Sequence, residues 1–315
     1  MSTAIVPLAT AVPAVWGTNR LVDSFLSGKS EMTLRAYRTD LETFASFMGA
    51  DNIDEAAQAL LTRSHGEANG LALDYKACLM DKGLSSATVN RRLASLRSLI
   101  TLARTLGLVS WTLEVKNLKS QPYRDTKGPG VPAFRRMLLV LKSRGDRKAV
   151  RDFSIVRLLY DIALRRGEVV SLDVDDVDLD AGTIQVLGKG RREKIRLTLP
   201  DPTKEALVAW LEIRGEESGP LFTNCDRAGK GDRLTGNSIY RLVKSLGSKI
   251  GVMSRPHGLR HTAITEACKV AQANGYALEE VLDFSRHSDI STLLIYRDRE
   301  RDCLGKLASL VADSV

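Results

Sequence analysis

The chain is organised around the segment from His257 to Tyr296. It begins with His257-Gly-Leu-Arg260-His261-Thr and ends with Arg-His287-Ser-Asp-Ile-Ser-Thr-Leu-Leu-Ile-Tyr296. The chain has four histidines, and three of them lie in this stretch. His257 and Arg260 are three residues apart, so on a helix they project from one face and can act on one chemical group. His287 and Tyr296 add an imidazole and a phenol. These groups together indicate a site for a phosphate ester.

Composition favours a globular protein of two domains. A length of 315 residues suits two domains better than one. Hydrophobic residues make up 43% and charged residues 27%, which is ordinary for a soluble protein. The sequence contains no run of about eighteen apolar residues, so no membrane span or membrane partner is expected. The net charge of +8 points weakly to a polyanionic partner.

The cysteines and the N-terminal residues indicate the cellular compartment of the protein. Cys78, Cys225, Cys268 and Cys303 are scattered, without a CxxC or histidine-paired spacing. This pattern predicts reduced thiols in a cytoplasmic protein and no zinc site. Residues 1–17 are apolar and contain proline, but no basic segment precedes their apolar part. We therefore interpret them as a flexible extension and not as a signal peptide.

Residues 18–110 show helical periodicity and no strand pattern, which predicts a small helical domain. Apolar residues repeat at helical spacing after the hydroxyl cap at Ser30, and further helices are expected at about 54–61, 70–81 and 90–100. The polar faces carry five arginines: Arg35, Arg38, Arg91, Arg92 and Arg97. Two interpretations are open for them, a solvated basic surface or contacts to DNA phosphates.

A linker and a second domain follow. Residues 111–132 contain basic, proline and glycine residues without a sustained period, which predicts a linker. The second domain, 133–315, opens with helices expected at about 134–142 and 150–164. Glu168 can orient Arg165 by a charge-assisted hydrogen bond, and a purely structural salt bridge is the alternative.

A β-hairpin is expected next. Apolar and β-branched residues at 183–187 and 195–199 flank Gly188-Lys189-Gly190, so Lys189 lies near the predicted tip. A solvated surface charge is the alternative for this lysine. The acidic residues of 173–180 are the nearest candidates for a metal site, and we interpret them as solvated.

Four segments together resemble the tyrosine recombinases, also called phage-type integrases, which include the Xer-like site-specific recombinases. They are Ala163-Leu-Arg165-Arg-Gly-Glu168, Gly188-Lys189-Gly190, His257-Gly-Leu-Arg260-His261 and His287-Ser-Asp-Ile-Ser-Thr-Leu-Leu-Ile-Tyr296. Their order and approximate gaps match the family over nearly the whole chain. The resemblance implies a mainly α protein with a small β-sheet. A helical core-binding (SAM-like) domain and a catalytic domain would form a C-shaped clamp on double-stranded DNA.

The resemblance also implies a catalytic arrangement around one phosphate. Tyr296 would be the nucleophile, and because a free phenol has a pKa near 10, it needs His257 as general base. Arg165 and Arg260 would hold the non-bridging oxygens with permanently charged planar groups. His287 would hydrogen-bond the phosphate in the transition state.

Two further roles come from the resemblance. Lys189 would protonate the departing 5′ oxygen, although Lys194 also lies on the hairpin, and Glu168 would orient Arg165. The expected product is a 3′-phosphotyrosyl intermediate with a free 5′ hydroxyl. This bond conserves the phosphodiester energy, so no ATP, metal or other cofactor is expected.

The sequence departs from the family at Arg286, where the family commonly has glycine, and this adds a cation near the phosphate. In the tail, Leu304, Leu307, Leu310 and Val311 have helical spacing. They predict a helix that packs either on its own domain or, as we favour, in trans on a neighbouring protomer of a tetramer at synapsed recombination sites.

Two alternative functions are DNA relaxation like that of a type IB topoisomerase and DNA binding without catalysis. The topoisomerases typically lack the histidine of His-x-x-Arg, which His257 supplies. No arginine or tyrosine of the set is missing, which argues against the second. The sequence therefore predicts a site-specific recombinase.

Overall fold

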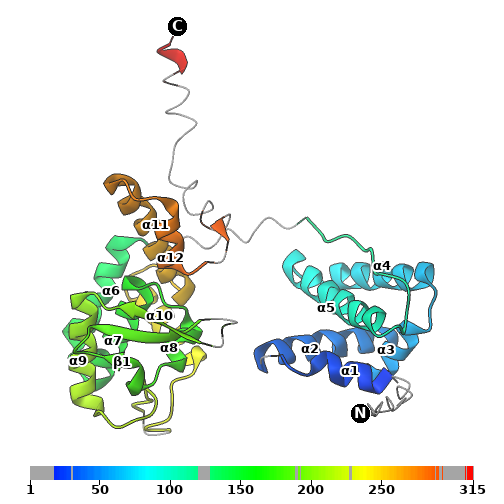
Figure 1. The fold of residues 1–315 in the computed structure, drawn as a ribbon, viewed down its shortest axis with the longest axis horizontal. Coiled ribbons are helices and arrows are strands. Elements are labelled where there is room, and N and C mark those ends of the chain that lie inside the picture. The colour runs from blue at the N-terminus through cyan, green and yellow to red at the C-terminus, as the bar shows by residue number, and fades with distance from the viewer. Residues whose placement is uncertain are drawn as a thin grey trace, which may run out of the picture. The chain divides into compact units, whose positions relative to one another are not determined.

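The computed structural model describes residues 18–29, 31–119, 128–188, 191, 193–226, 229–287, 289–290, 293, 309 and 311–314. The chain divides into two compact units, Met1–Tyr123 and Arg124–Val315, and each has its own hydrophobic core. Helices dominate both units, and one small sheet lies in the second (Figure 1). The mainly helical fold with a small sheet, expected from the sequence, is confirmed.

The regular structure of the first unit is helical throughout its described residues. Its helices are α1 (Thr18–Leu26), α2 (Glu31–Met48), α3 (Ile53–Leu61), α4 (His65–Asp81) and α5 (Ser86–Thr105). Helix α4 begins five residues before the expected Gly70, because Ser64 caps it. The Glu67 carboxylate accepts the Ser64 backbone N–H at 2.9 Å, which completes a capping box.

A buried carboxylate ties two of the predicted DNA-contacting arginines to this unit. Asp40 is 1% exposed, and its Oδ2 lies 2.5 Å from Arg91 Nη1 and 2.7 Å from Ser95 Oγ. Arg92 Nε lies 3.8 Å from the other oxygen. A buried charge requires such partners. Arg91 and Arg92 therefore link α2 to α5, and their contact with DNA phosphates stays a prediction that these ion pairs do not test.

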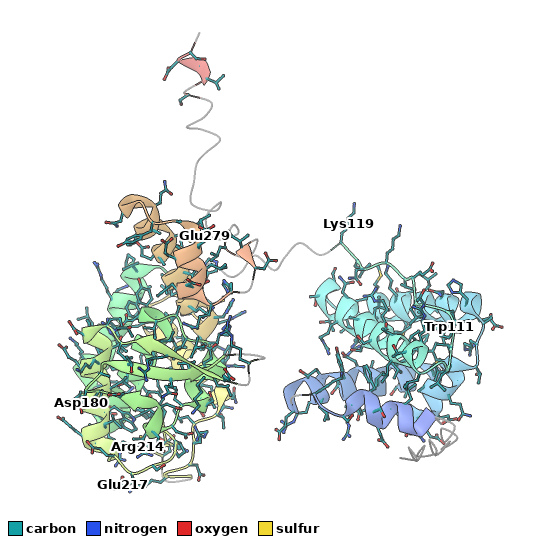
Figure 2. The ribbon with its side chains drawn as sticks, in the orientation of Figure 1. Trp111, Lys119, Asp180, Arg214, Glu217 and Glu279 are labelled. Atoms are coloured by element: carbon teal, nitrogen blue, oxygen red, sulfur yellow. The ribbon has the colours of Figure 1, made fainter. Side chains whose placement is uncertain are left out.

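The segment from Trp111 to Lys119, whose ends are labelled in Figure 2, packs along α4 and α5. Leu113 and Val115 are buried in the first core. The Arg97 guanidinium donates to the Val115 carbonyl at 2.9 Å and to the Asn117 amide oxygen at 2.6 Å. The first residues of the predicted linker are thus part of this unit, and Arg97 holds them.

The second unit contains a three-stranded antiparallel sheet with helices around it. The strands are β1 (Val177–Asp178), β2 (Thr183–Leu187) and β3 (Lys194–Thr198), and β2 lies in the middle. Thr183 pairs with Thr198 and Leu187 with Lys194, so β2 and β3 form the expected hairpin. Strand β1 was not expected. Ile184 and Val186 point into the core, which fixes the register of the sheet.

The helices of the second unit pack around α7 (Arg147–Asp161), which contacts α6 (Val131–Arg144), α9 (Asp201–Arg214) and α11 (Pro256–Asn274). Its described residues also form α8 (Arg166–Ser171), α10 (Gly236–Lys249) and α12 (Leu278–Ser285), and a 3-10 turn at Val174–Asp176. The sequence had given no expectation for α8, α9 and α10. Helices α11 and α12 lie side by side (Figure 1).

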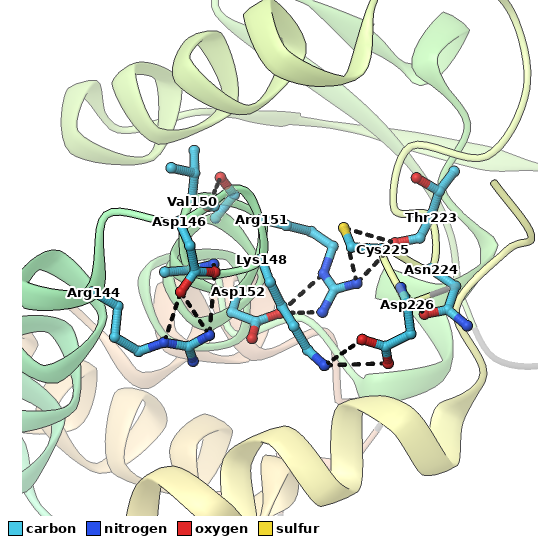
Figure 3. A network of polar contacts seen from close by, with 12 residues as sticks. Arg144, Asp146, Lys148, Val150, Arg151, Asp152, Thr223, Asn224, Cys225 and Asp226 are labelled. Carbon is cyan, nitrogen blue, oxygen red and sulfur yellow. Dashed lines mark hydrogen bonds and ion pairs between the residues drawn. The ribbon is translucent and has the colours of Figure 1, made fainter. Parts of the chain in front are cut away.

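A polar network fixes the loop after α9 to the start of α7 (Figure 3). Arg151 is 4% exposed, and it binds the neighbouring Asp152 carboxylate at 2.6 Å and the Thr223 carbonyl at 2.9 Å. Lys148 reaches Asp226 at 3.0 Å. Each buried charge in this network has a partner, as burial requires.

Asp175, Asp178 and Asp180 are exposed, as expected, whereas two other acidic residues of 173–180 form ion pairs. Asp176 binds Lys194, and Asp173 binds Arg233 at 2.5 Å. Across the described part of the chain, no cluster of histidine, cysteine, aspartate and glutamate has an arrangement that could hold a metal ion. No helix among the described residues is long and apolar enough to cross a membrane. Cys78 and Cys225 carry free thiols.

Candidate active site

The turn after α7 supplies the backbone around which the site is built. Ala163 has φ +47°, a left-handed conformation that is uncommon for a residue with a Cβ, and it is fully buried. The carbonyls of Ile162 and Ala163 accept hydrogen bonds from arginines that belong to distant segments. This strained turn is therefore an anchor for the charged side chains described next.

Arg165 stands at the N-cap of α8 and is held by Glu168 one turn later. Glu168 is 3% exposed, and its Oε1 lies 2.7 Å from Arg165 Nη1. Its Oε2 accepts the Arg165 backbone N–H at 2.8 Å. The contact expected from the sequence is thus present. A two-point hold of this kind fixes the direction of the guanidinium.

Helix α11 carries His257 and Arg260 on successive turns. Pro256 occupies its first turn, where a missing N–H costs nothing. Arg260 is 1% exposed, and its guanidinium donates to the carbonyls of Ala163 and Ser285. His257 is solvent-exposed at the start of the helix. Arg260 therefore joins α11 to the turn after α7 and to the end of α12.

His287 follows the end of α12 and faces Arg260. Its Nε2 lies 3.4 Å from Arg260 Nη2, and its backbone N–H lies 3.4 Å from Ser285 Oγ. Arg286, which lies between Ser285 and His287 in the sequence, has φ +54° and ends α12 in the left-handed conformation. This reversal places the imidazole beside the arginines.

The site is electropositive, and both histidines respond to this. Burial, followed by the charges of Arg260 and Arg165, lowers the pKa of His287 to about 4. Partial desolvation and the same two arginines lower the pKa of His257. A cationic neighbour disfavours a second positive charge. Both shifts favour the neutral imidazole.

The structure brings together Arg165, Glu168, His257, Arg260 and His287, all from the second unit, as their electrostatic interactions and contacts show. Lys189 and Tyr296 lie outside the described residues, as do Leu304, Leu307 and Leu310 of the tail. Val311 is described and exposed. Arg35 and Arg38 are exposed on α2 of the first unit, where Arg35 lies 3.8 Å from Glu31.

Sequence reasoning missed three features of the site. The carbonyls of Ala163 and Ser285 have no signal in the sequence, because every residue carries a carbonyl. Arg286 was noticed only as an added cation. In the structure its guanidinium is buried against Glu168 and the turn after α7. Burial lowers the pKa of Arg286, and the Glu168 carboxylate offsets only part of this shift.

The fold and the arrangement of the site agree with sequence comparison. Residues 134–302 match the model of the family described as "Phage integrase family". Residues 25–105 match the model described as "Phage integrase, N-terminal SAM-like domain". The chain therefore belongs to the phage integrase family. This confirms the resemblance drawn from the four segments.

Curated relatives and solved structures give the same picture. A protein named tyrosine recombinase from Synechococcus elongatus is 38% identical over 291 residues, covering 90% of each chain. Another of that name, from Synechocystis sp., is 35% identical over 94% of this chain and 95% of its own. The fold resembles that of XerH site-specific recombinase bound to a palindromic difH substrate, with a TM-score of 0.66 and 19% identity. The match covers 94% of this chain and 85% of XerH.

Proposed function

We propose that this protein is a site-specific DNA recombinase that breaks and rejoins DNA strands through a 3′-phosphotyrosine on Tyr296. The observation that carries the proposal is the grouping of two arginines and two histidines from three separate segments of one unit. Membership of the phage integrase family and relatives named tyrosine recombinases support it.

The arginines suit a phosphodiester in transesterification. Negative charge grows on the non-bridging oxygens as the new bond forms, and Arg165 and Arg260 carry permanent positive charge. Glu168 and the backbone carbonyls hold their guanidinium groups before substrate arrives. Such preorganisation means that little rearrangement is required at the moment of reaction.

The histidines act in their neutral forms. A neutral His257 has a free acceptor nitrogen and can take the proton of Tyr296 as general base. His287 would donate a hydrogen bond to a phosphate oxygen. Because an anion favours the protonated imidazole, a bound phosphate would raise the pKa of His287 from its value of about 4 in the free protein.

The leaving 5′ oxygen needs a proton, and we assign this role to Lys189. The alternative on the hairpin, Lys194, is bound to the buried Asp176 carboxylate, which restrains its ammonium. That contact supports Lys189 as the donor. The departing oxygen leaves as a hydroxyl, and the phosphotyrosyl bond keeps the phosphodiester energy for rejoining.

The proposed partner is double-stranded DNA with a specific recombination site. XerH, which shares the fold, was solved on its difH substrate. Arg35 and Arg38 are the two predicted DNA contacts that lie exposed on α2, and we propose them as phosphate contacts. A tetramer at synapsis, with the tail docked in trans and the two domains clamped on DNA, completes the proposal.

Covalent trapping tests the function. DNA with a nick near the cleaved phosphate loses its short product, so a protein–DNA adduct accumulates. DNA recovered with the purified protein by selective enrichment supplies the site. We expect an adduct with the wild type and none with Tyr296→Phe. In the same assay, Lys189→Ala should slow adduct formation far more than Lys194→Ala.

Three results would contradict parts of the proposal. An adduct with Tyr296→Phe would identify another nucleophile, and a larger effect of Lys194→Ala would reverse the assignment of the proton donor. Relaxation of supercoiled DNA without sequence preference would instead indicate a topoisomerase.

A further inference from the structure

We propose that Arg286 is a positioning residue, which holds both Arg165 and Arg260 in place for the phosphate. The inference rests on the proposed function, since it concerns the same site. Arg286 lies at the end of α12, directly before His287, and its side chain is 7% exposed. A guanidinium buried this far must be used by the protein, because an unpaired buried charge is costly.

The side chain of Arg286 points into the turn after α7. Nη1 donates to the Ile162 carbonyl at 2.9 Å, and Nη2 donates to the Ala163 carbonyl at 2.8 Å. Nη2 also lies 3.2 Å from Glu168 Oε2. One planar group thus joins the end of α12, the turn after α7 and the first turn of α8.

Two of these acceptors are shared with the proposed catalytic arginines. The Ala163 carbonyl also accepts from Arg260, and the Glu168 carboxylate also binds Arg165. Any movement of these acceptors therefore moves the arginines. Arg286 contacts both of these shared acceptors.

The backbone of Arg286 makes a third link. Its carbonyl accepts a hydrogen bond from Arg165 Nη2 at 3.0 Å. The direction of that carbonyl depends on the left-handed conformation at φ +54°, which glycine adopts more readily than arginine. The chain keeps an arginine at a position whose backbone favours glycine, which is consistent with a use for the side chain.

Arg286→Gly separates the contribution of the Arg286 side chain from that of its backbone carbonyl. The substitution suits the left-handed turn, so the carbonyl that binds Arg165 is kept, while the guanidinium is lost. Glu168 then has one cationic partner, and the Ile162 carbonyl loses its donor. We expect Arg165 and Arg260 to lose their fixed position, and a misplacement of about 1 Å costs roughly 100-fold in rate.

A neutral substrate distinguishes positioning from a general effect on the fold. A methylphosphonate at the cleaved position replaces one charged oxygen with a methyl group, which removes the charge that the arginines neutralise. A variant that disturbs the arginines then loses less on this substrate. A variant that is partly unfolded loses equally on both substrates.

The experiment measures single-turnover adduct formation on both DNAs, with DNA affinity and thermal melting recorded for each variant. Arg286→Gly should be about 10- to 100-fold slower on the phosphodiester and within about threefold of wild type on the methylphosphonate. Arg165→Ala is the reference for this pattern. Arg286→Lys, which keeps a cation without the planar fork, should fall between wild type and Arg286→Gly.

Arg151→Gln is the matched control. Arg151 is another buried arginine of this unit that binds a carboxylate and a carbonyl, but at the start of α7 (Figure 3). The folded fraction of this variant should cleave both DNAs like the wild type. The inference is overturned if Arg286→Gly cleaves the phosphodiester at the wild-type rate, or if it slows equally on both substrates. Absence of an adduct with the wild type would instead overturn the proposed function, and this inference with it.

Discussion

Ala163 shows how one residue without a functional side chain can organise a site. Its left-handed conformation turns a single carbonyl toward Arg260 and Arg286, which come from two other helices. The two guanidinium groups that donate to the Ala163 carbonyl hold this turn in place. The turn therefore fixes the start of α8, where Arg165 lies. At this scale the site depends on backbone direction as much as on side-chain chemistry.

His287 gives the free protein a dependence of stability on pH. Its pKa is about 4 in the folded state, against about 6.5 for an unperturbed imidazole. The unfolded chain therefore binds the proton first as pH falls. Stability should be complete above about pH 6.5, fall between about pH 6.5 and 4, and change no further from this group below that range. The upper limit of the loss is about 3 kcal/mol, reduced by solvent screening.

Thermal melting as a function of pH checks this prediction. His287→Gln keeps a polar group of similar reach that does not titrate, so its melting temperature should fall less between pH 6.5 and 4 than that of the wild type. His257 contributes in the same direction, because its pKa is also lowered. Equal slopes for the two proteins would contradict the assignment of a depressed pKa to His287.

At the scale of elements, the segment Gly128–Gly130 lies directly against the first turns of α11. The Gly130 backbone N–H lies 3.3 Å from Thr262 Oγ1. A Cβ on Gly128 would lie 1.9 Å from that oxygen and 2.3 Å from the Gly258 carbonyl. Glycine is therefore required at 128 by the close approach of two backbones.

Gly128→Ala should consequently destabilise the second unit by about 1–3 kcal/mol, a cost typical of overpacking. It should also slow adduct formation, because Gly258 lies between His257 and Arg260. Gly258→Ala is a matched control on the other side of the same contact, where the new Cβ would meet Pro129 at an ordinary 3.5 Å. Thermal melting compares the two variants, and equal stability would contradict the proposed clash.

At the scale of the whole molecule, the chain has separate cores. The core of the first unit uses residues between Leu21 and Val115, and it includes none of the buried residues of the second unit. The segment from Trp111 to Lys119 closes this core. A fragment of residues 18–119 therefore contains everything that its own core requires.

We expect that fragment to fold alone and to unfold cooperatively on heating, as measured by circular dichroism. Arg97→Ala should lower its stability by about 1 kcal/mol, because the Val115 carbonyl and Asn117 lose their donor. Arg38→Ala, an exposed change on α2, should stay within about 0.5 kcal/mol of the parent fragment. A fragment without a cooperative transition would refute the independence of the first unit.

The sequence alone determined the class of fold, the helices with strong periodicity, the β2–β3 hairpin and the identity of the charged residues of the site. These depend on local spacing, since helical and strand periods report which side of an element is buried. Helix α4 began earlier than expected, because the capping box at Ser64 was not recognised.

The tertiary structure decided which groups meet. It placed the Arg286 side chain in the turn after α7, and it showed contacts of Arg91, Arg92 and Arg97 within the first unit. It also depressed the pKa of His287, first by burying the imidazole and then by placing Arg260 and Arg165 from other segments near it. A periodic pattern carries no information on the direction of a backbone carbonyl or on the distance between remote segments. Both arise only when the helices pack.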